Sequence, residues 1–223
     1  MKIYKYIIGL LTAFILFSLT ACSSPAETKS EELQPSETSE TEVSESVDDA
    51  STDGSGVIVA YFSATGNTRS VAESIADITG GELYEIVPSE PYTAEDLDYG
   101  NRQSRSSLEM GDPSSRPEIG SAELSLDDCS TLYLGYPIWH GQAPRIMDTF
   151  VETYDFEGIT VIPFCTSGGS GIGSSAENLA ALAGSGNWLE GQRFSANVSD
   201  TDIYNWLNGS VNNMEQEEYK KAE

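Results

Sequence analysis

The sequence predicts an α/β domain built on a doubly wound, five-stranded parallel sheet with helices on both faces. Short apolar runs alternate along the chain with segments in which apolar residues recur at helical spacing, a pattern typical of three-layer α/β/α domains. The run 159–164 is apolar except for Thr160, as expected for a strand that is buried on both faces. The predicted strands are 57–62, 82–87, 131–136, 159–164 and a more polar fifth, 188–196.

The first and third helices are predicted from an apolar face and from a sequence signal at one end. Gly80 and Gly81 stop the first helix, and Pro144 stands in the first turn of the third, where proline is favoured. Their apolar faces consist of Val71, Ala72, Ile75 and Ala76 in the first helix and of Ile146, Met147, Phe150, Val151 and Tyr154 in the third. Each helix can therefore pack one side on the sheet.

Two further helices are predicted near the end of the domain. The segment 175–183 has helical spacing and ends before Gly184. The segment 199–207 begins with Ser199 and Asp202, whose spacing resembles that of a capping pair.

The connection 88–123 is the least regular part of the domain. A helix over about 94–110, interrupted or frayed at Gly100, is one interpretation. Long connections often cover an active site, and plain packing against the sheet is an equally good interpretation.

The N-terminus reads as an export signal rather than as part of the domain. Lys2 and Lys5 precede an apolar run, 7–19, that is short for a membrane-spanning helix. The run ends in Leu-Thr-Ala followed by Cys22, which resembles a bacterial lipoprotein signal. This resemblance implies a signal peptide over 1–21, a lipid anchor on Cys22 and a location at the outer face of the cell membrane; an uncleaved membrane anchor is the alternative.

Composition divides the remainder into a linker, a domain and a tail. The segment 22–56 is rich in Ser, Thr and Glu and poor in large apolar residues, so we expect it to be disordered. The domain spans 57–213, and an acidic tail, 214–223, follows it. The formal net charge of −25 argues against nucleic acid as a partner and against adsorption to anionic lipid. We expect a monomer.

The segment 62–68 carries the strongest chemical signal in the chain. An apolar strand breaks here into a loop that holds hydroxyls and one glycine, and a helical pattern starts directly behind it. Ser63, Thr65 and Thr68 can donate hydrogen bonds to an anion, as can the N–H groups at the start of the helix, while Gly66 lets the backbone close tightly. The segment lacks the Gly-Lys-Ser/Thr ending of a P-loop. An ordinary strand-to-helix turn with a Ser/Thr cap is the alternative.

The run Ser63-Ala64-Thr65-Gly66-Asn67-Thr68 resembles the phosphate loop of the flavodoxin family, whose pattern is hydroxyl-x-Thr-Gly-x-Thr. The resemblance extends over 57–208 and implies the strand order 2-1-3-4-5 and FMN as the cofactor. It departs from the family in the connection 88–123.

Two further loops are similar to those with which flavodoxins hold the flavin ring. The loop after the third strand contains Pro137, Ile138, Trp139, His140 and Gly141, and the resemblance implies that the Trp139 indole covers the ring. Trp139 packed on its own domain is the alternative. His140, the single histidine, can supply a proton or a positive charge near the flavin, or be an exposed polar residue. One histidine cannot build a metal site, and we expect none.

The loop after the fourth strand is rich in glycine, which allows close backbone approach to a ligand. The resemblance places Thr166, Ser167, Gly168, Gly169 and Gly171 at the flavin. The run 171–176 also fits a relaxed dinucleotide fingerprint, but no acidic residue follows at the required distance after a new strand.

Cys129 and Cys165 are expected to be buried free thiols. Cys129 stands just before the third predicted strand and Cys165 just after the fourth, which are opposite ends of a parallel sheet. Six or seven residues of strand separate them by roughly 20 Å, too far for a disulfide.

The sequence therefore indicates an FMN-dependent electron carrier that works with a redox partner protein or with a small-molecule donor or acceptor. One alternative is a flavin-dependent reductase of quinones or small oxidants that uses NAD(P)H. A flavin-free binding or scaffold module is the second.

Overall fold

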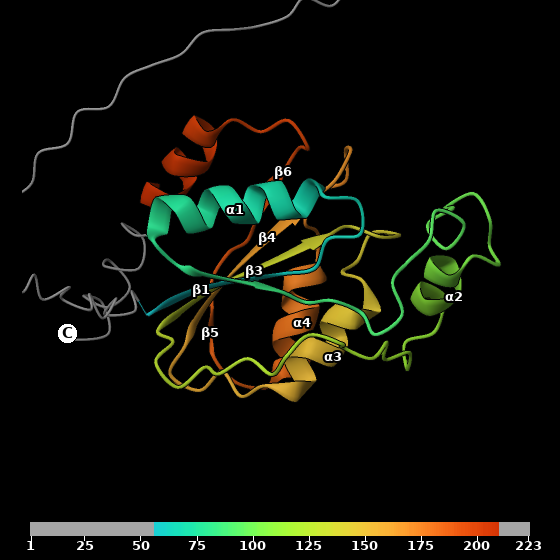
Figure 1. The fold of residues 1–223 in the computed structure, drawn as a ribbon, viewed down its shortest axis with the longest axis horizontal. Helices are drawn as coiled ribbons and strands as arrows, with labels where there is room; N and C mark the ends of the chain where they lie inside the picture. Colours follow the sequence, from blue (N-terminus) through green and yellow to red (C-terminus); the bar gives the residue numbers. More distant parts are fainter. Residues whose placement is uncertain (1–55, 210–223) are drawn as a thin grey trace, which may run out of the picture. The chain divides into compact units, whose positions relative to one another are not determined.

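The computed structural model describes residues 56–209 (Figure 1). The predicted signal peptide, Cys22, the linker except for residue 56, and the tail lie outside this range. Within it, no helix is both long and apolar enough to cross a membrane.

A parallel sheet forms the centre of the domain, and its strand order is β2-β1-β3-β4-β5, as predicted. A short extra strand, β6, pairs with β4. The strands are β1 (Val57–Tyr61), β2 (Glu82–Glu85), β3 (Thr131–Pro137), β4 (Thr160–Thr166), β5 (Asn187–Trp188) and β6 (Gln192–Phe194). The predicted α/β fold class is therefore confirmed.

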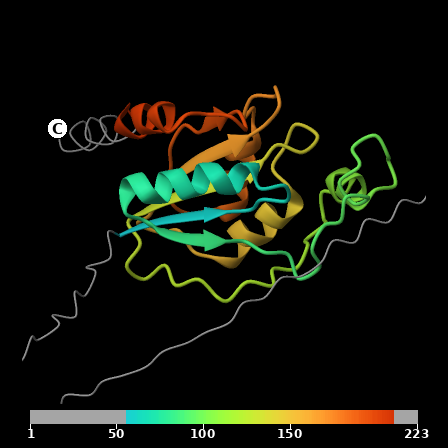
Figure 2. The same cartoon turned by 45° about the horizontal axis from the view of Figure 1, so that its top comes forward.

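Helices cover both faces of the sheet, as Figures 1 and 2 show. One face is covered by α1 (Asn67–Thr79) and a C-terminal helix over 200–209, whose Ile75, Ile203 and Leu207 belong to one buried cluster. The other is covered by α3 (Arg145–Thr153) and α4 (Ser175–Ala183), which contribute Phe150 and Leu179 to a second cluster.

The helix ends follow the predicted signals. Gly80 closes α1 in the left-handed conformation, with φ 67°, and Gly184 closes α4 with φ 68°. Ser199 Oγ accepts a hydrogen bond from the Asp202 N–H at 3.2 Å and donates one to the Asp202 carboxylate at 2.7 Å. The predicted capping pair is thus confirmed.

The predicted fifth strand, 188–196, is wrong as a single element, because it is divided into β5 and β6. Every second residue of β4 points its backbone N–H and C=O groups toward β5 and β6. The Val161 carbonyl accepts from the Leu189 N–H, and the Ser167 N–H, directly after β4, donates to the Phe194 carbonyl. Pro163 occupies the same side and has no N–H to donate. At the break, a Cβ on Gly191 would lie 2.9 Å from the Pro163 carbonyl oxygen, so the chain passes too close for a side chain.

The predicted helix over 94–110, interrupted or frayed at Gly100, is confirmed only in its last turns and is wrong before Gly100. α2 (Arg105–Gly111) begins after Ser104, whose Oγ accepts from the Ser107 N–H at 3.4 Å. Residues 94–103 form turns fixed by side chains instead, as at Asp96, which accepts from the Thr93 N–H at 2.9 Å.

Both domain cysteines are free thiols, as predicted, but two details differ. Cys129 is half-buried rather than buried, and Cys165 lies inside β4 opposite Tyr136 of β3. Burial raises the pKa of the Cys165 thiol to about 12, so this thiol stays protonated and unreactive at neutral pH.

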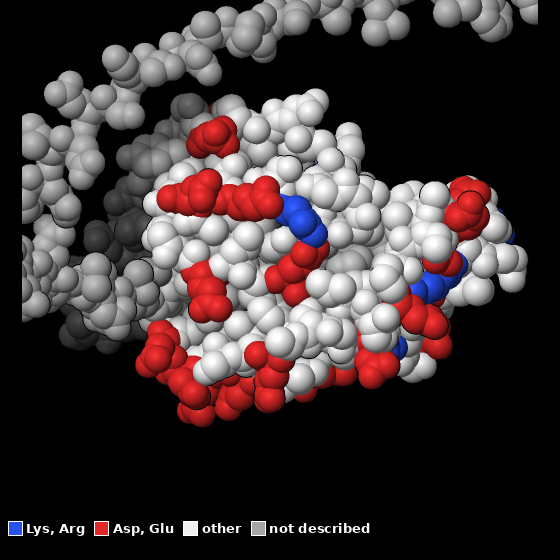
Figure 3. Space-filling view, in the orientation of Figure 1, with Lys and Arg blue, Asp and Glu red and all other residues white. Residues whose placement is uncertain are grey.

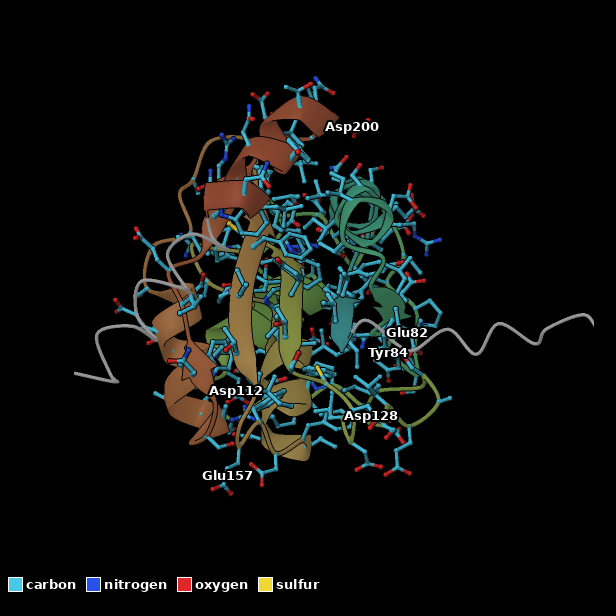
Figure 4. The ribbon with its side chains drawn as sticks, turned by 90° about the vertical axis from the view of Figure 1, so that its left-hand side faces the viewer. Glu82, Tyr84, Asp112, Asp128, Glu157 and Asp200 are labelled. Atoms are coloured by element: carbon cyan, nitrogen blue, oxygen red, sulfur yellow. The ribbon has the colours of Figure 1, made fainter. Side chains whose placement is uncertain are left out.

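The two edges of the sheet differ in charge. We call the edge where the strands begin the amino edge and the edge where they end the carboxyl edge. Glu82, Asp128 and Glu157 precede or begin strands at the amino edge, and Figure 4 shows them at the periphery of the domain. Acidic side chains far outnumber basic ones on the face that Figure 3 shows. The carboxyl edge carries hydroxyls, aromatic rings and glycines, and Glu85 at the end of β2 is paired there with Arg69.

Candidate functional site

The first loop, residues 62–66, joins β1 to α1 at the carboxyl edge. Gly66 has φ 86°, and its N–H donates to Ser63 Oγ at 3.1 Å. The Asn67 side-chain amide donates to Thr65 Oγ1 at 3.3 Å. No side chain caps the start of α1, and Thr65, Gly66 and Asn67 are exposed. The first turn of α1 therefore presents N–H groups to solvent, as an anion site requires.

Arg69, in the first turn of α1, does not serve this loop. Its guanidinium binds both carboxylate oxygens of Glu85 on β2, at 2.5 and 2.6 Å. A phosphate at the loop would consequently be bound by hydroxyls and N–H groups rather than by this cation.

A buried hydrogen bond joins the first turn of α1 to the end of β4, where the third loop begins. Thr68 Oγ1 lies 2.8 Å from Thr166 Oγ1, and the two residues are 1% and 4% exposed. Each hydroxyl has one proton and two acceptor positions, so the pair can still donate one further bond. The ends of β1 and β4 are thereby held together across the site.

The second loop, after β3, is a tight hairpin. Trp139 and Gln142 exchange two backbone hydrogen bonds of 2.9 Å, which leaves His140 and Gly141 at the tip with φ 49° and 83°. His140 is the one non-glycine residue with positive φ in the described part of the chain. The Ile138 N–H donates to the Thr166 carbonyl at 2.9 Å, so this hairpin also contacts the third loop.

Trp139 lies in the core, which contradicts the prediction of an indole open to the flavin ring. It is 1% exposed, and its ring meets Phe62 and Tyr92 edge-on at centroid distances of 5.5 and 5.0 Å. Tyr99 covers it at 6.3 Å and is itself 51% exposed. The exposed aromatic ring at this rim therefore belongs to the connection between β2 and β3.

This connection packs against the second loop. Tyr99 also contacts the His140 ring, at a centroid distance of 5.7 Å, and Ser107 Oγ lies 3.5 Å from His140 Nε2. Tyr92 and Pro91 line a hollow of about 150 Å³ beside Ser63. The sequence had given no role at the site to Tyr92, Tyr99 or Ser107. The signal that could have indicated one is that this irregular segment contains two tyrosines.

Ionic contacts fix the connection in place. The Tyr92 hydroxyl donates to Glu109 Oε2 at 2.5 Å, and the Arg105 guanidinium lies 4.1 Å from the centre of the Tyr92 ring. Burial, followed by the contact with Glu109, raises the pKa of Tyr92 far above its usual value. Arg145 of α3 donates to the Glu109 carbonyl at 3.4 Å and to the Asp148 carboxylate at 2.9 Å. α2 is thereby tied to α3.

The third loop, residues 166–173, is open where the second is filled. Gly168 and Gly169 are exposed, and a Cβ on either would meet no other atom within 4 Å. Neither has a positive φ, so the protein's own packing and backbone do not require glycine there. Space beside the backbone is what a flat ligand needs, and these glycines fit that use.

The family comparison agrees with this geometry. The family model described as Flavodoxin matches residues 56–210. The chain belongs to the flavodoxin family. No curated protein matches it.

Solved structures extend the comparison. A Bacteroides eggerthii protein assigned as a flavoprotein is 46% identical, with 68% of this chain and 95% of its own covered, at a TM-score of 0.64. A similar assignment in Bacteroides uniformis is 44% identical, with 70% and 99% covered, at a TM-score of 0.66. A flavoprotein from Lactobacillus acidophilus in complex with FMN shares the fold at 22% identity, with 67% and 97% covered and a TM-score of 0.52.

The flavodoxin domain thus brings all three predicted loops together at the carboxyl edge. The predicted cofactor residues in these loops are Ser63, Thr65, Gly66, Asn67, Thr68, Pro137, Ile138, Trp139, His140, Gly141, Thr166, Ser167, Gly168, Gly169 and Gly171. Their contact with a cofactor stays a prediction; Trp139, Thr68 and Thr166 are buried, and Trp139 is in addition enclosed by aromatic rings. Among residues 56–209, no cluster of three His, Cys, Asp or Glu could hold a metal ion.

Proposed function

We propose that the flavodoxin domain binds FMN and transfers electrons through it. The observation that carries this proposal is the uncapped start of α1 beside Ser63 and Thr65, joined through Thr68 and Thr166 to a loop of open glycines. The FMN complex of the Lactobacillus acidophilus protein, which has the same fold, supports the choice of ligand.

Different residues would bind the phosphate and the ring of FMN. N–H groups of the first turn of α1, with the hydroxyls of Ser63 and Thr65, suit a phosphate monoester. The backbone at Gly168 and Gly169 suits the edge of a flat ring. Tyr99 and His140 would shield the ring from water at the rim. The bound flavin would supply the redox chemistry.

The experiment is an absorption spectrum of the purified protein after incubation with FMN and removal of free ligand. Retained flavin bands, with FMN released on heating, are the expected result. A colourless protein would exclude electron transfer and would favour the flavin-free binding module instead.

The acidity of the protein gives the carrier role a further test. Reduced flavin is negatively charged, so a net charge of −25 should disfavour it and lower the second reduction potential. We expect this potential to rise with ionic strength, because salt screens the repulsion. A second reduction potential that does not change with ionic strength would contradict the electrostatic argument.

We further propose that a lipid on Cys22 holds the protein at the outer face of the cell membrane as a monomer. The support is the sequence before Cys22, which lies outside the described residues. Cys22→Ala should move the protein from the membrane fraction into the soluble one. Retention of this variant in the membrane would favour an uncleaved anchor.

A reductase of quinones or small oxidants is the second candidate. His140 and the half-exposed Tyr99 stand together at the rim, where a planar oxidant could meet a proton donor. Rapid oxidation of NAD(P)H by the FMN-loaded protein, slowed by His140→Gln, would select this function. Slow oxidation of NAD(P)H at the same rate in the wild type and in His140→Gln would select the electron carrier.

A further inference from the structure

Arg193 differs from the other arginines of the described segment. That segment holds six arginines and no lysine. Four of the six form ion pairs with carboxylates: Arg69, Arg105, Arg116 and Arg145. Arg102 is exposed and has no such pair in residues 56–209, whereas Arg193 is half-buried and binds Ser167 instead.

The contacts of Arg193 fix the third loop. Its Nη2 donates to the Ser167 carbonyl at 2.5 Å, and its Nε donates to Ser167 Oγ at 3.1 Å. The Ser167 N–H donates to the Phe194 carbonyl at 3.2 Å, and Ser167 Oγ donates to the Ser170 carbonyl. Arg193 therefore fixes the position of Ser167, which directly precedes the open glycines Gly168 and Gly169.

The break in the fifth strand places Arg193 there. β6 pairs with the end of β4, with Arg193 opposite Cys165 and Phe194 opposite Thr166. A Cβ on Gly191 would lie 2.4 Å from Ile172 Cδ1, so β6 lies close against the third loop. No carboxylate of the described residues lies within 4 Å of this guanidinium, so its charge stays unneutralised.

We infer that Arg193 is a positioning residue for the flavin, which shapes the third loop and supplies a positive charge that favours the reduced, anionic cofactor. This inference rests on the proposed binding of FMN. A charge in a half-buried site is weakly screened, so it acts more strongly than one in solvent. In a protein of net charge −25, it would partly offset the repulsion of reduced flavin.

Three variants separate the charge from the hydrogen bonds. Arg193→Gln removes the charge, Arg193→Lys keeps the charge but loses the fork that holds Ser167, and Arg102→Gln is the matched control for loss of one charge. The protein is loaded with FMN, and the dissociation constants of oxidised and reduced FMN are measured together with the potential. Amide exchange of residues 167–171 is followed without FMN.

For Arg193→Gln we expect reduced FMN to be weakened about tenfold more than oxidised FMN, which corresponds to a potential lower by about 30 mV for the two-electron couple. Arg193→Lys should restore the potential but still bind oxidised FMN more weakly. In both Arg193 variants the backbone amides of residues 167–171 should exchange faster than in the wild type. Arg102→Gln should match the wild type in FMN affinity, potential and amide exchange.

Equal weakening of both redox forms by Arg193→Gln would overturn the charge role, and unchanged loop exchange would overturn the positioning role. A potential shifted as much by Arg102→Gln would show an effect of net charge alone. If the wild type retains no FMN, the proposed function fails and the inference fails with it; retained FMN with silent Arg193 variants overturns the inference alone.

Discussion

The loops after β3 and β4 stand at the same edge of the sheet but are built in opposite ways. The loop after β3 is filled: Trp139 is 1% exposed and is enclosed by Phe62, Tyr92 and Tyr99. The loop after β4 is open: Gly168 and Gly169 have no neighbour near the Cβ position. The loop after β3 gets its shape from apolar packing, and the loop after β4 from hydrogen bonds to Arg193.

This difference separates residues that hold the fold from residues that leave room for a ligand. Truncation of a side chain in the filled loop removes packing and should lower stability. Addition of a side chain in the open loop removes space and should lower affinity without a cost to the fold. Substitutions in the two loops should therefore have different readouts.

The largest effect is expected in the filled loop. Trp139→Ala should lower the free energy of unfolding by about 3–5 kcal/mol, because it leaves a cavity among three aromatic rings. Chemical denaturation without FMN measures it. Tyr204→Ala, at a residue 52% exposed, is the control and should change stability by about 0.5 kcal/mol or less. A loss below about 1 kcal/mol for Trp139→Ala would show that the indole is not a core residue.

The complementary effect is expected in the open loop. Gly169→Val should weaken FMN binding at least tenfold, about 1.4 kcal/mol, and leave stability within about 0.5 kcal/mol. Titration with FMN and denaturation of the ligand-free protein measure the two quantities. Gly209→Val, where a Cβ also meets no atom within 4 Å, is the control far along the chain. Equal affinity for Gly169→Val would mean that no ligand approaches this glycine.

Loss of a single donor in the first loop should have an effect of similar size. Thr65→Val should weaken FMN by about 1–3 kcal/mol, because the phosphate loses one hydrogen bond. Asn67→Ala should act in the same direction. Thr65→Ser keeps the hydroxyl and should restore affinity. Unchanged affinity in Thr65→Val would remove this loop from the phosphate site.

The smallest effect concerns an ion pair that helps to hold the connection. Arg116 binds both carboxylate oxygens of Glu152, at 2.7 and 2.8 Å, and this contact lowers the pKa of Glu152. A lowered pKa means that the pair stabilises the fold above about pH 4.5 and that this contribution is lost as the pH falls through the folded-state pKa.

Glu152→Gln should therefore cost about 0.2–1 kcal/mol at pH 7, since the pair is partly exposed, and nothing once Glu152 is protonated in the wild type. Unfolding measured at pH 7 and at successively lower pH gives both values. Glu177→Gln, which breaks no ion pair of the described residues, is the control. A difference that does not diminish as the pH falls would point to a packing effect rather than to charge.

Much of the fold could be predicted from the sequence because the relevant forces are local. The strand 159–164 was predicted to within two residues, and helix 175–183 matches α4. Ser199 and Asp202 cap their helix as their spacing suggested. Such signals depend on residues a few positions apart, so periodicity and capping express them directly.

One of the two errors arose from a distant residue and the other from local side-chain hydrogen bonds. The break between β5 and β6 depends on Pro163, which lies more than 20 residues earlier in the chain. The turns that replace a helix over 94–103 depend on side chains such as Asp96, which bond to the backbone in place of helical partners. A count of apolar residues records neither effect.

The sequence by itself determined the alternating elements and the three loops, because each is encoded within a short run of residues, whereas the absence of a side-chain cap on α1 was seen only in the structure. Only the tertiary structure decided that Trp139 is enclosed, that Tyr99 and Ser107 reach His140, and that Arg193 holds Ser167. The residues that these contacts join are 26 to 77 positions apart in the sequence. They exist because the parallel sheet brings the ends of β1, β3 and β4 to one edge, where side chains from distant segments compete for the same space.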